Sequence, residues 1–188
     1  MEQIKNFSSE TPKSKEEIEQ QRQFLLNLNL ILSVYDRVII PKNDIDNIID
    51  KIENYLKEKE PNMPEETLGE ITEMMQKYLK NLSGNQIYAS DVLRVILKAR
   101  EKTWYGSIIY MLRKFLEISK EYLNQEYEEY KKTVDEVLIL AQNELKTTEF
   151  FKVLTKLLIG PYNGDYLMEF KERVNREIKE LNKELERM

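Results

Sequence analysis

The stretch FLLNLNLILSV, residues 24–34, decides the fold of this chain. Its apolar residues fall on nearly every side of a helix, whereas a surface helix carries a single apolar stripe. Ser14 and Glu17 form the capping-box pattern that begins such a helix, and we expect it to reach about Tyr35. A helix that is apolar almost all round is buried almost all round. The rest of the chain must therefore supply the helices that cover it.

The remaining sequence favours helices as well. Only 5 Gly and 5 Pro occur among 188 residues, so turns are few, and a sheet protein needs many of them. Apolar residues recur at helical spacing through residues 45–56, 68–82 and 92–97. The pattern predicts an all-α bundle of six to eight helices with an amphipathic C-terminal helix. Val38–Ile40, which precede Pro41, are expected to form a short extended connection.

Turn and capping signals divide the chain into four segments. The sequence Gly-Pro-Tyr-Asn-Gly at 160–164 is the strongest turn signal, and Asp165 can cap the helix that follows it. The predicted organisation is a flexible tail over 1–13, an N-terminal helical region over 14–84, a central helical bundle over 85–160 and a C-terminal helix over 161–188.

The C-terminal helix carries one narrow apolar stripe with charged residues between its members. Such a stripe is typical of a helix that faces a partner or forms a coiled-coil arm. We predict a protein interface, within a homo- or hetero-oligomer, at Leu167, Phe170, Val174, Ile178, Leu181 and Leu185.

The composition excludes several kinds of chemistry. The chain has no Cys and no His, which removes disulfides, thiolate nucleophiles, ordinary zinc sites and Ser-His-Asp catalysis. No glycine-rich phosphate loop occurs, and we read the acidic residues between Asp44 and Glu53 as a solvated helix face. We predict a non-enzyme without cofactor or metal, although chemistry based on Glu, Lys and Tyr is an enzymatic alternative. The sequence shows neither a signal peptide nor a membrane span, so a cytoplasmic protein is expected, and its richness in Lys, Glu and Ile resembles a thermophile's.

One basic run offers a second kind of site. Between Arg94 and Lys114 the chain has six basic residues and one acidic residue, Glu101, with aromatic residues interleaved. Cations bind phosphates, and aromatic rings stack on unpaired bases. The candidate nucleic-acid-binding residues are Arg94, Lys98, Lys102, Trp104, Arg113 and Lys114. The alternative is an ordinary solvated face with its aromatic residues in the core, which the net charge of −5 favours.

Three stretches give the chain a resemblance to a known family. They are YASDVLRVILKARE at 88–101, LRKFLEISKEYL at 112–123, and the apolar pattern of 138–158. Together they resemble the helical domain of archaeal GINS subunits, which join the replicative helicase complex. Phe115-Leu116 stands where that family has Phe-Tyr. The resemblance implies a helical domain and a role in a DNA replication complex.

Two hypotheses of function follow from the sequence. The first is a non-enzymatic scaffold or interaction subunit of a multiprotein complex, with a replication complex as one setting. The second is a small helical nucleic-acid-binding module, such as the small subunit of an RNA-guided effector complex or a mobile-element replication factor. The C-terminal stripe favours the first, and the basic run favours the second.

Overall fold

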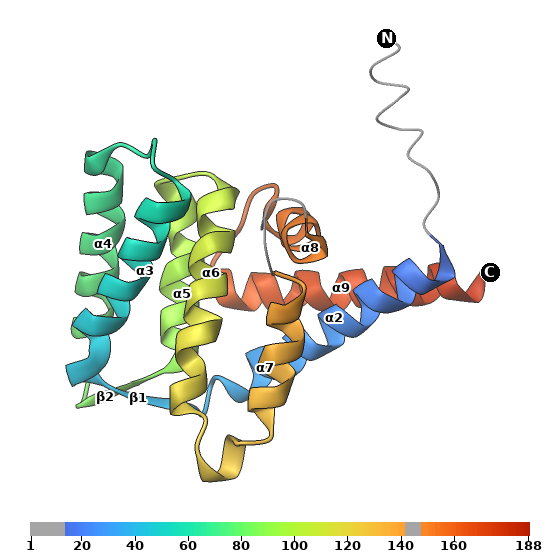
Figure 1. The fold of residues 1–188 in the computed structure, drawn as a ribbon, viewed down its shortest axis with the longest axis horizontal. Coiled ribbons are helices and arrows are strands. Elements are labelled where there is room, and N and C mark those ends of the chain that lie inside the picture. Colours follow the sequence, from blue (N-terminus) through green and yellow to red (C-terminus); the bar gives the residue numbers. More distant parts are fainter. Residues whose placement is uncertain (1–13, 142–147) are drawn as a thin grey trace.

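The computed structural model describes residues 14–141 and 148–188, and this part of the chain forms eight α-helices and one two-stranded sheet (Figure 1). The all-α prediction is confirmed. The elements are α2 (Lys15–Val34), β1 (Ile39–Pro41), α3 (Ile45–Lys59), α4 (Glu65–Lys80), β2 (Gln86–Tyr88), α5 (Ala89–Lys98), α6 (Tyr105–Ser119), α7 (Tyr130–Ile139), α8 (Glu149–Leu158) and α9 (Tyr166–Glu186). Short 3₁₀ turns lie at η1 (Lys42–Asp44), η2 (Ala99–Glu101), η3 (Lys120–Tyr122) and η4 (Gln125–Tyr127).

Helix α2 begins and ends as its sequence predicts. The Ser14 hydroxyl accepts a hydrogen bond from the amide of Glu17, and Tyr35 follows the last helical turn. Tyr35 is fully buried and packs edge-on against the ring of Phe115 in α6. Its hydroxyl is hydrogen-bonded to that of Ser119, which itself donates to the carbonyl oxygen of Leu116. The C-terminal end of α2 is thereby attached to α6.

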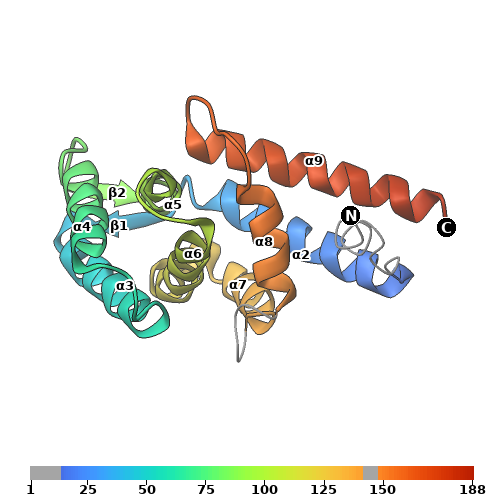
Figure 2. The ribbon, with the colours of Figure 1, turned by 90° about the horizontal axis from the view of Figure 1, so that it is seen from above.

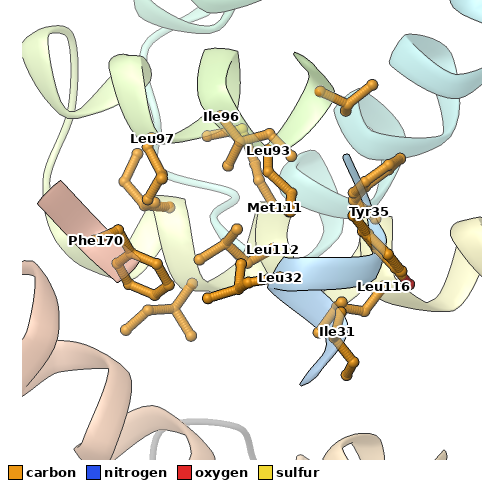
Figure 3. Close-up of a cluster of buried hydrophobic side chains, with 14 of the residues drawn as sticks. Ile31, Leu32, Tyr35, Leu93, Ile96, Leu97, Met111, Leu112, Leu116 and Phe170 are labelled. Carbon is orange, nitrogen blue, oxygen red and sulfur yellow. The ribbon is translucent and has the colours of Figure 1, made fainter. Parts of the chain in front are cut away.

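Helix α9 crosses beside α2, so the two ends of the described chain pack together (Figures 1 and 2). This differs from the predicted partner interface. Five of the six stripe residues are buried within the chain, and Leu185 is partly buried against the same core. In Figure 3 Phe170 of α9 faces Leu97 and Leu112, beside Leu32 of α2. The periodicity required a covering surface, but it could not tell whether another chain or this one supplied it.

The extended connection is a strand with a partner. Ile40 pairs with Ile87 in an antiparallel register, with Ile39 opposite Tyr88. An extended segment was predicted here, but its partner strand β2 was not, because three residues are too few to show an alternating pattern. The helices α3 and α4 form the connection between the two strands and pack against α6 and α5 respectively (Figure 1).

A single hydrophobic core runs through the three helical segments named from the sequence, whereas the tail predicted over 1–13 lies outside the described residues. It includes Ile48 of α3, Leu93 of α5, Phe150 of α8 and Val174 of α9. The boundaries near residues 84 and 160 therefore mark turns, and the segments on either side of them pack together. In the described part of the chain no helix is both long enough and apolar enough to cross a membrane.

We expect Phe170→Ala to lower the free energy of unfolding by about 3–5 kcal/mol, because it leaves a cavity where α9 meets α2 and α5. Met168→Ala is the matched control on the same helix, since the Met168 side chain is 62% exposed. It should change stability by no more than about 0.5 kcal/mol. Urea denaturation followed by circular dichroism measures both. Equal effects would contradict the packing of α9 described above.

Candidate functional site

A cleft of about 510 Å³ opens where α4, the end of α5 and the connection from α8 to α9 meet. This volume lies within the range of small-molecule sites. The residues that line it are Tyr78, Arg94, Lys98, Glu101, Tyr162, Asn163, Gly164, Asp165 and Tyr166. Tyrosine and arginine are the residue types that contribute most to binding energy at protein interfaces.

Two arginines hold the wall formed by the α8–α9 connection. Arg100 donates to the carbonyl oxygens of Leu158 and Gly160, and Arg173 donates to those of Leu157, Ile159 and Pro161. These carbonyl groups include the end of α8, where a helix leaves such acceptors without partners. The fork of a guanidinium group can serve several acceptors at once, so the connection is fixed without regular structure.

Tyr162 lies at the centre of this connection. The guanidinium groups of Arg100 and Arg173 lie over its ring, 4.1 and 4.0 Å from the ring centroid. Its hydroxyl donates to the carbonyl oxygen of Leu157 at 2.7 Å. Burial raises the pKa of Tyr162 to about 12, against the opposing effect of the two cations, so the hydroxyl stays a donor at neutral pH. Gly164, at φ 64°, provides the left-handed backbone that turns the chain into α9.

Asp165 joins the connection to α5 and begins α9. Its carboxylate accepts hydrogen bonds from the amides of Leu167 and Met168 and lies 3.3 Å from Nε of Arg94. Burial acts to raise the pKa of Asp165, but the Met168 amide and the Arg94 guanidinium outweigh it and hold the pKa below its usual range. The predicted cap is confirmed, and it also forms an ion pair across the cleft wall.

The charged residues of the cleft differ in whether their side chains already have a bonding partner within the chain. Arg94 bonds to Asp91 as well as Asp165, and Tyr166 donates its hydroxyl to Glu101 at 2.7 Å. Lys98 is exposed at the last position of α5, and no carboxylate of the described residues lies within 4 Å of its Nζ. Among the described residues, Lys98 is therefore the cation of the cleft that has no carboxylate partner and can meet a ligand.

The structure divides the predicted nucleic-acid-binding residues among three places. Arg94 and Lys98 line the cleft, whereas Lys102 lies beyond it, because α5 ends at Lys98 and the 3₁₀ turn η2 follows. Arg113 and Lys114 both pair with Glu117 on α6 and lie over the ring of Tyr55 in α3. The six residues therefore do not form one surface.

Trp104 lies at the start of α6 and is 43% exposed. Its indole ring packs over Gly106, where a Cβ atom would come within 2.3 Å of it, and stands 5.2 Å from the ring of Tyr105. The close contact explains why residue 106 is glycine. An exposed aromatic pair beside Lys102 resembles a surface on which an unpaired base can stack.

Of the nine residues that line the cleft, Arg94 and Lys98 were predicted from the sequence as binding residues, and the other seven were not. Tyr78, Tyr162 and Tyr166 come from separate helices and a turn, and no local pattern relates them. The turn signal at 160–164 was the one indication that this region is special. In the parts of the chain that the structure describes, no cluster of acidic residues is arranged to hold a metal ion.

The low pKa of Asp165 predicts how stability depends on pH. The carboxylate stabilises the fold above the ordinary pKa of an unfolded aspartate, about 4, and this contribution is lost as the pH falls through the lower folded value. Asp165→Asn keeps a side-chain oxygen for the cap and removes the charge, so its free energy of unfolding should fall less between about pH 5 and pH 2. Urea denaturation at several pH values measures the difference. Parallel curves for the two proteins would contradict it.

Comparison of the chain with protein-family models, with curated proteins and with solved structures gave no match. The resemblance of residues 88–160 to GINS subunits therefore stays a prediction. Three features of the cleft bear on function: its shape, its tyrosine and arginine lining, and Lys98, which has no carboxylate partner among the described residues.

Proposed function

We propose that this chain is a non-enzymatic interaction subunit that binds another protein through the cleft between α4, α5 and the α8–α9 connection. The observation that carries the proposal is the lining of the cleft, where the partly exposed side chains of Tyr78 and Tyr166 lie with Arg94 and come from separate parts of the chain. Tyrosine contributes a large contact area at a low cost in side-chain entropy, and its hydroxyl gives direction to the contact.

The rigidity of the cleft supports the same proposal. Arg100 and Arg173 fix the connection, while Asp165 and Glu101 tie its end to α5 and η2. A binding surface that is already ordered loses little conformational entropy when it binds. The resemblance to GINS subunits suggests a replication complex as the setting in which to look for the partner first.

A photocrosslinking experiment tests the proposal in cells of the source organism. The residue p-benzoylphenylalanine replaces Asn163, which is exposed at the cleft, and in a control it replaces exposed Lys179, roughly 20 Å along α9 from its start. We expect a discrete protein adduct at position 163 that is missing at position 179. The same adduct at both positions, or none at position 163, would refute a protein partner at the cleft.

The nucleic-acid alternative keeps one supporting observation, the exposed Trp104–Tyr105 pair beside Lys102. Against it, Arg94, Arg113 and Lys114 already pair with carboxylates, and the chain has a net charge of −5. A phosphate backbone needs several available cations, so the geometry favours the protein partner.

A titration with labelled single-stranded oligonucleotides at low and moderate salt tests this alternative. If it holds, Trp104 fluorescence is quenched, and Trp104→Ala weakens binding by about 1–3 kcal/mol through lost stacking. Lys102→Glu should also lower the slope of log affinity against log salt by about one or more. We expect none of these effects for the isolated chain, and steep salt-dependent binding would make the nucleic-acid function the better one.

A further inference from the structure

The charges of the cleft indicate what kind of partner segment it accepts. Four charged side chains line it, and within the described residues three of them have bonds across the cleft wall: Arg94 with Asp165, and Glu101 with the hydroxyl of Tyr166. Lys98 is the fourth, and it has no carboxylate of the described residues within ion-pair distance. A ligand group that meets Lys98 need not displace a bond that the chain already makes.

We propose that the cleft accepts an acidic peptide segment of the partner protein, with a carboxylate paired to Lys98 and an apolar or aromatic neighbour against Tyr78 and Tyr166. The inference rests on the proposed function and specifies its partner.

The same charges select against other occupants. A basic segment would bring a second cation toward Lys98 and Arg94, and the carboxylates of Asp165 and Glu101 are already bonded. A nucleic-acid strand carries a phosphate at every nucleotide, so its neighbouring phosphates would approach Glu101 and Asp165 while only one could reach Lys98. A peptide can place one carboxylate at Lys98 and uncharged groups elsewhere. This difference favours a peptide over a polyanion.

The test begins with a display library of random heptapeptides selected against the 188-residue chain. We expect the enriched peptides to share an Asp or Glu next to an apolar or aromatic residue, and to compete with the photocrosslinking adduct at position 163. Lys98→Glu should weaken the leading peptide about five- to tenfold, since it replaces an attraction with a repulsion. Lys102→Glu, the same change on an exposed lysine outside the cleft, should leave its affinity unchanged.

A charge exchange makes the result specific. Replacing the acidic residue of the leading peptide with Lys should weaken its binding to the wild-type chain and restore binding to Lys98→Glu. Lys98→Glu and Lys102→Glu both alter exposed side chains of the chain, and circular dichroism checks that each variant folds. If the peptides compete with the adduct at position 163 but bind Lys98→Glu as tightly as the wild type, the proposal of an acidic segment is refuted. The proposed interaction function is then still supported. If the library yields no competing peptide, the proposal that the cleft accepts a short peptide segment is refuted. An adduct at position 163 in the photocrosslinking experiment would still support a protein partner.

Discussion

The packing of α9 against α2 is the contact on which the rest of this structure depends. It joins the first and last helices of the described chain and buries Phe170 beside Leu32 of α2 and Leu97 of α5. Fully burying an apolar side chain of this size contributes about 1.5–3 kcal/mol. Because α9 is held along its length, its first residues are fixed next to α5. The cleft exists because the α8–α9 connection must end at that place.

The connection itself is stabilised by polar contacts of a particular kind. Arg100 and Arg173 donate to five carbonyl oxygens between residues 157 and 161, and both cations lie over the ring of Tyr162. Exposed ion pairs between flexible side chains contribute little to stability. Guanidinium groups that satisfy several backbone acceptors and rest on an aromatic ring lose less side-chain freedom for each bond they form. These contacts hold the segment that contains Gly160 and Pro161 in place without regular secondary structure.

The distribution of charge shows how an acidic chain can still present a local cation. Most lysines and arginines of the basic run have structural partners: Arg94 with Asp165, Arg100 with backbone carbonyls, and Arg113 with Glu117. A count of basic residues along the sequence therefore overstates the positive charge that a ligand meets. Lys98 differs because it lies at the end of α5, where its neighbour Glu101 is bonded to Tyr166.

Local chemistry determined much of the structure. The Ser14 and Asp165 caps, the all-round apolar pattern of α2 and the turn at 160–164 act over a few residues, so the sequence predicted the helices and several of their ends. The apolar stripe predicted on α9 is also confirmed as the buried face of that helix.

Tertiary structure alone decided what each of these elements meets. It covered the α9 stripe with the chain's own α2 and α5, paired β1 with β2, and brought Tyr78, Lys98 and Tyr162 to one cleft. An apolar period specifies that a face is buried and says nothing about its partner, because hydrophobic attraction has no direction. Side chains from separate segments share a site only when packing has fixed every helix between them.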